Sequence, residues 1–309
     1  MREWTRLYFS HQKMSGRGGG RRNVRRRVQA SYDKTAGVPR PPDSKIARAE
    51  VNCRKAWLFD NWSRCNPENC ALVMNLGCGQ GGDAHKIARV VTSGSTIVNV
   101  DFSTHSLDEF RSRVAAVERL HPFSWAFECE DVVTWTVPDR YYRRADFVCA
   151  MLCMHYFAEG QEQLTQFFTK VRDLLKPGAS FVAVYPDPTT IVPRLDAAVP
   201  ISDLYNEFNG ELFSLEVRPG ELQAFKDGET ATCSYRFSLD GTMTRVNEYI
   251  ITHSMLVDAV QDAGLTLCED VNLLELDVGS LRQAMNLRGG MQESARELLC
   301  LYKAVRVTV

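Results

Sequence analysis

A run of glycines between an apolar segment and a helical pattern is the part of this chain best suited to chemistry. Residues 77–83 read Gly-Cys-Gly-Gln-Gly-Gly-Asp and directly follow the apolar run 71–76. Glycines permit a tight turn and close approach of a ligand to the backbone, and a helix that starts there offers free N–H groups. The spacing fits both GxGxxG and GxGxG, and the strand–turn–helix–strand context indicates a site for an adenosyl-type cofactor.

Carboxylates follow the next two predicted strands. Asp101 ends the second strand, 24 residues after Gly77, where a carboxylate accepts hydrogen bonds from the ribose hydroxyls of NAD or of S-adenosylmethionine. Asp131 follows the third strand, where a carboxylate can accept the amino protons of adenine. The turn Leu-Lys-Pro-Gly at 175–178 resembles class I methyltransferases, and it therefore favours S-adenosylmethionine over NAD.

The elements around these residues alternate between strand and helix. The predicted strands are apolar runs at 71–76, 95–101, 121–129, 145–154 and 180–186, and the predicted helices lie at 44–64, 81–91, 106–120 and 162–175. Buried strands that alternate with helices of about 10–15 residues are typical of a doubly wound parallel sheet covered on both faces. We therefore expect an α/β fold with a Rossmann-like, class I methyltransferase sheet.

The pattern changes in the C-terminal half of the chain. There the predicted elements are short strands within 211–217 and 231–251, a helix at 254–264, and strands at 265–276 and 298–308. We expect residues 195–250 to form an antiparallel β insertion over the carboxyl edge of the sheet, without helices between its strands. Residues 44–309 would then form one domain that contains this insertion.

The formal net charge of −1 hides a separation of charge along the chain. The first 40 residues carry 11 Lys and Arg against two acids, so the rest of the chain is strongly acidic. We expect residues 1–43 to form a disordered basic tail that contacts RNA or carries a nuclear localisation signal. A transit peptide and a solvated tail without a role remain alternatives. No apolar run approaches the roughly 18 residues of a membrane span, so no membrane partner is expected.

The cysteines and histidines do not suggest a metal site. The ten cysteines contain no CxxC pair and the six histidines no HExxH motif. Several cysteines lie inside apolar runs, and no secretory segment precedes them. This usage indicates reduced thiols in a cytosolic or nuclear compartment, and we expect no metal.

Six short motifs, in order along residues 44–309, resemble the messenger RNA cap guanine-N7 methyltransferases. They are Asn-x-x-Lys at 52–55, LGCGxGGD at 76–83 with a lysine at 86, His-Tyr at 155–156, Tyr-Pro-Asp at 185–187 in place of the family's Thr-Pro-Asn, Tyr-x-Phe-x-Leu at 235–239, and Glu-Tyr-Ile at 248–250. The family transfers a methyl group from S-adenosylmethionine to N7 of the guanine cap of mRNA. The resemblance therefore implies this cofactor, capped RNA as the substrate, and a nuclear location, with the cytoplasm as the alternative.

The resemblance also implies roles for individual positions. The expected cofactor-binding residues are Lys55, Gly77, Asp101, Asp131, Met151 and Tyr156. The expected cap-binding residues are Asn52, Gln80, Lys86, Arg113, His155, Pro186 and Glu248. Whether an activating subunit of the capping apparatus is needed stays open.

The implied reaction suits these residue types. Guanine N7 carries a lone pair and no proton, so in-line methyl transfer requires placement and electrostatics rather than a general base. A carboxylate such as Glu248 accepts from N1–H and the 2-amino group of guanine, and a donor such as His155 can serve O6. Substituting alanine for either residue should therefore reduce activity chiefly through cap binding and placement.

The sequence departs from the family pattern at several positions. Asn75 replaces the acid that usually precedes the glycines. Gln80 stands where the family often has a basic residue, and Met151 stands where it has a glutamine. The family's C-terminal cap tyrosine aligns with Leu299, and Tyr302 lies three residues further on. Two alternatives therefore stay open: another class I methyltransferase acting on a small molecule or another RNA base, and an inactive RNA-binding homologue.

Overall fold

The computed structural model describes residues 42–309 apart from 64, 66–69 and 288. The predicted basic tail falls almost entirely outside the described residues. Helix α2, Pro42–Trp62, begins two residues before its expected start. None of the described helices is both long enough and apolar enough to cross a membrane.

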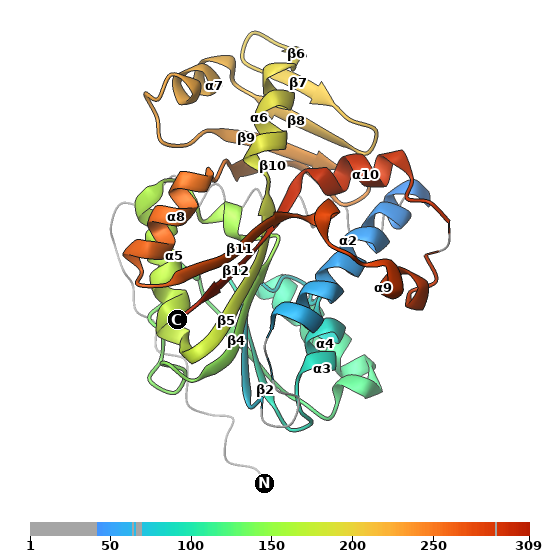
Figure 1. Ribbon diagram of the computed structural model, residues 1–309, viewed down its shortest axis with the longest axis vertical. Coiled ribbons are helices and arrows are strands. Elements are labelled where there is room, and N and C mark those ends of the chain that lie inside the picture. Colours follow the sequence, from blue (N-terminus) through green and yellow to red (C-terminus); the bar gives the residue numbers. More distant parts are fainter. Residues whose placement is uncertain (1–41, 64, 66–69, 288) are drawn as a thin grey trace.

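A seven-stranded mixed sheet forms the centre of the molecule (Figure 1), in the order β11-β12-β5-β4-β1-β2-β3. Its strands are β1 Leu72–Leu76, β2 Thr96–Asp101, β3 Ser124–Cys129, β4 Ala145–Met151, β5 Leu175–Pro186, β11 Thr266–Asn272 and β12 Tyr302–Thr308. Strands β1 to β5 pair in parallel, and β12 runs antiparallel to both of its neighbours. The predicted doubly wound α/β fold is confirmed.

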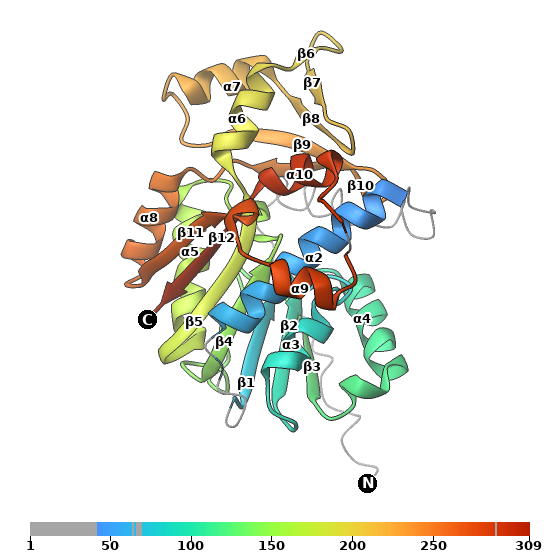
Figure 2. The same ribbon diagram turned by 45° about the vertical axis from the view of Figure 1, so that its right-hand side comes forward.

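Helices cover both faces of this sheet, as Figures 1 and 2 show. One layer holds α2, α3 Ala84–Val90 and α4 Thr104–Ala116; the other holds α5 Gln161–Leu174 and α8 His253–Asp262. Because side chains alternate across a strand, Val73 packs in the core beneath α2 while its neighbour Met74 packs beneath α5. Strands buried on both faces explain the continuous apolar runs of the sequence.

A second, five-stranded antiparallel sheet lies beyond the carboxyl ends of β1, β4 and β5 (Figure 1). Its strands are β6 Val199–Pro200, β7 Asn206–Asn209, β8 Phe213–Val217, β9 Ser234–Leu239 and β10 Met243–Tyr249, and helix α6, Pro188–Asp196, leads into it. The expected antiparallel strands are confirmed. The expectation that no helix separates them was wrong, because Pro219–Lys226 form α7, where Pro219 starts the helix and Leu222 is buried.

The C-terminal segment differs from its prediction. The expected strand 298–308 begins only at Tyr302, the first residue of β12, because Glu293–Cys300 form helix α10. Ala295, Leu298 and Leu299 follow the i, i+3, i+4 spacing of a helix and are buried, and α10 packs on α2. Helix α9, Gly279–Ala284, was also not expected.

The turn predicted at Leu175–Gly178 lies inside β5 as an irregularity. Leu175 pairs with Ala145, and the register then resumes with Ser180 opposite Phe147. Gly178 has a positive φ of 78°, which a glycine adopts without strain. The residues between therefore bulge out of the sheet, as the turn composition predicts.

Candidate active site

The glycine turn, residues 77–83, leaves β1 in a conformation that requires glycine. Gly77, Gly79 and Gly81 have φ values of 60°, 51° and 75°. A Cβ on Gly77 would lie 2.5 Å from Sγ and 2.6 Å from Cβ of Cys153, and one on Gly81 would collide with the ring of Phe110. A Cβ on Gly79 would meet no described atom within 4 Å. Neighbouring side chains thus pack against Gly77 and Gly81, whereas the space beside Gly79 is open, which suits close approach of a ligand.

Asp101, at the end of β2, holds this turn in place. Its Oδ2 accepts a 2.8 Å hydrogen bond from the backbone N–H of Gly79, and its Oδ1 accepts a 2.9 Å bond from that of Ser103. Burial raises the pKa of Asp101, and these two N–H groups partly oppose the rise. A carboxylate has about four acceptor positions, so each oxygen keeps one for a further donor. The geometry therefore fits the ribose hydroxyls of an adenosyl cofactor.

Asp131 lies near this end of β2. The backbone N–H of Glu130 donates to the carbonyl of Asp101 over 3.1 Å, which draws the ends of β2 and β3 together. The Oδ1 atom of half-buried Asp131 accepts from the N–H of Val133 over 3.2 Å. Its proposed contact with adenine stays a prediction.

Cys153, beyond the end of β4, lies against the first residue of the glycine turn. Its thiol donates to the carbonyl of Leu76 over 3.2 Å and packs beneath Gly77. Burial raises the pKa of this thiol, Asp101 and Asp83 raise it further, and Lys55 opposes them. Sequence reasoning missed this positioning role, because a cysteine in an apolar run carries no signal of what packs on it.

Two lysines meet at the last residue of the glycine turn. Asp83 Oδ2 lies 2.6 Å from Lys55 Nζ, and Asp83 Oδ1 lies 2.8 Å from Lys86 Nζ. Burial alone would raise the pKa of Asp83, but the two ammonium groups outweigh it and lower the pKa to about 2. The expected cofactor lysine and the expected cap lysine therefore share one carboxylate. We call Lys55, Asp83 and Lys86 the Asp83 cluster.

The second sheet contributes Glu248, which is almost fully buried. Its Oε2 accepts a 2.6 Å hydrogen bond from the hydroxyl of Tyr235, and its Oε1 a 3.4 Å bond from that of Tyr156. Burial raises the pKa of Tyr235 well above its usual value, and Glu248 raises it further, so this hydroxyl acts as a donor. We call Glu248, Tyr235, Tyr156 and His155 the Glu248 cluster.

His155 is buried within the Glu248 cluster, with 2% of its side chain exposed. Its Nε2 lies 3.4 Å from Glu248 Oε1, and its ring centroid lies 4.2 Å from that of Tyr156. Among the described residues neither ring nitrogen has a hydrogen-bond partner. A buried polar group without a partner is unusual in a native protein and suggests that a ligand supplies one.

Pro186 and Tyr302 lie opposite each other, where β5 pairs with β12. Tyr302 is also among the groups that raise the pKa of Tyr235, so it lies near the Glu248 cluster. Leu299, which aligns with the family's cap tyrosine, is instead completely buried in α10. Whether Tyr302 takes the place of that tyrosine stays a prediction.

The four remaining predicted residues lie on α2, the glycine turn, β4 and α4. Met151 is buried at the end of β4, and Asn52 and Gln80 are half-buried on α2 and in the glycine turn. Arg113 is exposed in the last turn of α4. Burial lowers the pKa of Lys86, Asp83 opposes this, and Lys55 and then Arg113 lower the pKa further. The ligand contacts of these four residues stay predictions.

Asn75, which replaces the family's acid, is satisfied inside the main sheet. Its side-chain amide donates to Asn99 Oδ1 over 3.0 Å, and its own Oδ1 accepts from the thiol of Cys149 over 3.5 Å. Asn99 in turn donates to the carbonyl of Ala126 on β3. This departure therefore leaves no unpaired charge beneath the glycine turn.

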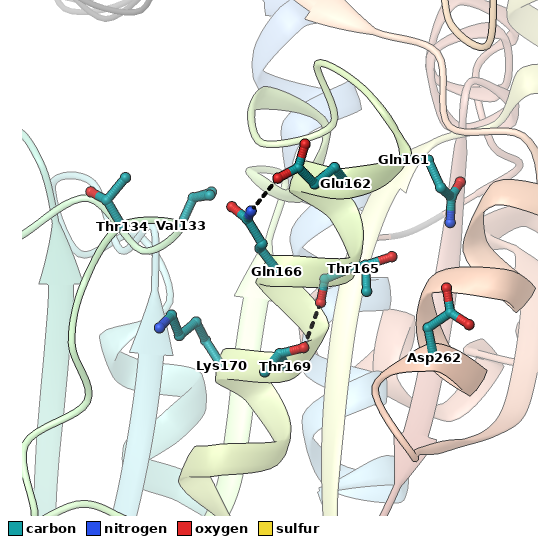
Figure 3. A pocket seen from close by; sticks show the side chains of 9 residues that line it. All are labelled: Val133, Thr134, Gln161, Glu162, Thr165, Gln166, Thr169, Lys170 and Asp262. Carbon is teal, nitrogen blue, oxygen red and sulfur yellow. Dashed lines mark hydrogen bonds between the residues drawn. The ribbon is translucent and has the colours of Figure 1, made fainter. Parts of the chain in front are cut away.

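A surface hollow of about 690 Å³ lies elsewhere, against the outer side of α5 (Figure 3). It is lined by Val133, Thr134, Gln161, Glu162, Thr165, Gln166, Thr169, Lys170 and Asp262. None of the residues expected to bind cofactor or cap lines it. The described part of the chain also contains no group of three His, Cys, Asp or Glu side chains that could hold a metal ion.

Comparison with known proteins identifies the family of this chain. The model of the mRNA (guanine-N(7))-methyltransferase domain family matches residues 21–298. The mRNA cap guanine-N(7) methyltransferase of Schizosaccharomyces pombe is 23% identical over 80% of this chain and 69% of its own length. Those of Candida albicans and Saccharomyces cerevisiae are 24% and 23% identical, over 82% and 79% of this chain.

Solved structures support the fold. The CcbJ methyltransferase from Streptomyces caelestis superposes with a TM-score of 0.53 at 17% identity, over 89% of this chain and 98% of that one. An S-adenosylmethionine-dependent methyltransferase from Mesorhizobium loti gives a TM-score of 0.50 at 16% identity, over 84% of this chain and 98% of that one.

This chain spans 58% of the length of the Candida relative and 57% of that of the Saccharomyces relative. Because the family model matches most of this chain, the chain belongs to the mRNA (guanine-N(7))-methyltransferase domain family.

Proposed function

We propose that this protein transfers a methyl group from S-adenosylmethionine to N7 of the guanine cap of mRNA. The observation that carries the proposal is a buried carboxylate, Glu248, fixed by Tyr235 next to a histidine whose ring nitrogens have no hydrogen-bond partner among the described residues. This pair lies beside the strand ends that carry the glycine turn and Asp101. A base-reading site and a cofactor-binding turn therefore face the same edge of the main sheet.

The Glu248 cluster has the chemistry to distinguish guanine from adenine. Glu248 presents acceptor oxygens to the N1–H and 2-amino groups, a pair of donors that adenine lacks in this arrangement. His155 supplies a donor for O6, where adenine has an amino group. Adenine would leave the buried polar groups of Glu248 and His155 without hydrogen-bond partners, which costs free energy. The site would therefore reject adenine more strongly than the shape of the base alone would allow.

The side chains around the cofactor site orient rather than transfer protons. The bound cofactor supplies an electrophilic methyl group on its sulfonium. Asp101 positions the ribose, Lys55 attracts the methionine carboxylate, and the glycine turn allows close backbone approach. Since N7 has no proton to lose, the chain needs no general base, and the buried setting of the Glu248 cluster strengthens its electrostatic effect.

Basic residues complete the proposed substrate site. Lys86 and Arg113 would contact the cap triphosphate, where charge-assisted hydrogen bonds are strongest. The basic tail at 1–43 would add non-specific contacts with the transcript, so deleting residues 1–40 should weaken binding to long RNA, with the loss fading as salt rises. We further propose a nuclear location, where these charges would meet new transcripts.

An acceptor panel tests this proposal against its alternatives. Labelled S-adenosylmethionine is offered with GpppA-capped RNA, ApppA-capped RNA, uncapped triphosphate RNA and GTP. We expect transfer to the GpppA-capped RNA and none to the ApppA-capped RNA. Equal labelling of ApppA and GpppA ends would indicate a different class I methyltransferase. A thermal shift with S-adenosylmethionine identifies the remaining alternative, because an inactive homologue that lacks cofactor binding would show none.

A further inference from the structure

Asp83 occupies a capping position but does not cap its helix. It directly precedes α3, where an aspartate usually accepts from a backbone N–H of the first turn, yet its side chain makes no such bond. Each of its oxygens instead binds one ammonium, that of Lys55 on α2 or that of Lys86 on α3. The carboxylate therefore links two helices through two lysines.

Both lysines are buried against this carboxylate, and Asp83 supports the charge of Lys86. The side chains of Lys55, Asp83 and Lys86 are 9%, 12% and 11% exposed, so water screens them little. Burial lowers the pKa of Lys86, and the charges of Lys55 and Arg113 lower it further. Asp83 is the group that raises it. Lys86 also donates to the carbonyl of Gly82 over 3.0 Å, which fixes its direction.

We propose that Asp83 is a positioning residue shared by the two binding sites. It holds Lys55 for the carboxylate of S-adenosylmethionine and Lys86 for the cap triphosphate, and it acts through these lysines. The inference rests on the proposed function, which assigns the two lysines to different ligands. One substitution at position 83 therefore weakens both ligands.

A second ion pair between the same helices provides a matched control. Arg89 of α3 lies 2.5 Å from Asp60 of α2, but these side chains are 49% and 31% exposed. Exposed pairs of this kind are screened by water and contribute little. Asp60→Asn therefore removes a carboxylate between α2 and α3 without touching the Asp83 cluster.

The test is calorimetric titration of wild type, Asp83→Asn and Asp60→Asn with S-adenosylhomocysteine and with GpppA, at pH 6.5 and pH 8.5. At pH 8.5 we expect Asp83→Asn to weaken both ligands by at least about tenfold. Binding of GpppA should recover toward wild type at pH 6.5. Without Asp83 the pKa of Lys86 is lowered further, so Lys86 carries more of its charge at pH 6.5 than at pH 8.5. Asp60→Asn should match wild type throughout.

Several outcomes would overturn the inference. Wild-type affinity of Asp83→Asn for either ligand would do so. An equal loss of GpppA affinity at both pH values would also do so, because it indicates a merely structural role. If wild type binds S-adenosylhomocysteine but not GpppA, the proposed function fails and the inference fails with it. Should Asp83→Asn not fold, Asp83→Glu retains the charge: it should weaken both ligands without pH dependence, and weakening of only one would contradict the proposal.

Discussion

The glycine turn with Asp101 and the Glu248 cluster lie at the same edge of the main sheet, but different interactions hold them. Asp101 is fixed by backbone N–H groups from residues 79 and 103, close to the strand that carries it. Glu248 is fixed by side-chain hydroxyls from β9 and from the segment after β4. The proposed cofactor side, the glycine turn with Asp101, therefore depends on local backbone geometry, whereas the proposed cap side, the Glu248 cluster, depends on how two sheets meet.

This difference makes the two sides separable by substitution. Substitutions at Gly77 or Gly81 should abolish cofactor binding together with stability, because these glycines pack against the buried side chains of Cys153 and Phe110. Changes to the Glu248 cluster should remove substrate recognition and leave the cofactor bound. The four substitutions below test that separation, from the largest expected effect to the smallest.

Gly77→Ala should have the largest effect. The new Cβ collides with Cys153 and the residue must keep a positive φ, which together cost about 2–6 kcal/mol. We expect a large fall in melting temperature and no measurable binding of S-adenosylhomocysteine. Gly79→Ala is the control for stability alone, because its Cβ meets no described atom and only the backbone strain of about 1 kcal/mol remains. Normal cofactor binding by Gly77→Ala would contradict the account.

Glu248→Gln should reduce methylation of GpppA-capped RNA by about 100-fold, because a buried charge that faces two donors is lost. Binding of S-adenosylhomocysteine, measured by calorimetry, should remain within about twofold of wild type. A parallel loss of cofactor affinity would show that the two sides are not separable.

Tyr235→Phe should weaken GpppA binding by about tenfold, since the shorter of the two hydroxyl hydrogen bonds to Glu248 is lost and only the 3.4 Å bond from Tyr156 remains. Tyr205→Phe is the control: its hydroxyl also contacts charged groups of the second sheet, Arg218 and Arg236, but not Glu248. An equal change in both variants would argue for a general effect on the second sheet.

Gln80→Arg should have the smallest effect and the opposite sign. It restores a cation to the glycine turn, and we expect a gain of about two- to fivefold in GpppA affinity at low salt. The gain should shrink as salt rises, and cofactor affinity should stay unchanged. A weaker GpppA interaction would mean that position 80 does not face the phosphates.

The cofactor side could largely be predicted from the sequence. The apolar runs, the glycines and Asp101 follow one another along the chain, and parallel strands bring their carboxyl ends to one edge. The cap side could be named only through resemblance to a family, because Glu248 lies 93 positions after His155 and no local pattern joins them. Their contact depends on the antiparallel sheet folding back over β4.

Other features could not be predicted because they depend on packing between distant segments. Helix α10 replaced part of an expected strand because its apolar residues fit against α2. Cys153 beneath Gly77 and the shared carboxylate of Asp83 arise where separate elements meet. That Tyr302 lies opposite Pro186 follows only from the register of β12 against β5.

The position of the transferred methyl group tests the central claim most directly. Wild-type protein is incubated with GpppA-capped RNA and S-adenosylmethionine that carries a deuterated methyl, and the RNA is digested and analysed by mass spectrometry. The account predicts the label on N7 of the cap guanine in wild type and its loss in Glu248→Gln. Label on an internal base or on a ribose hydroxyl, or unchanged guanine-N7 labelling by Glu248→Gln, would contradict it.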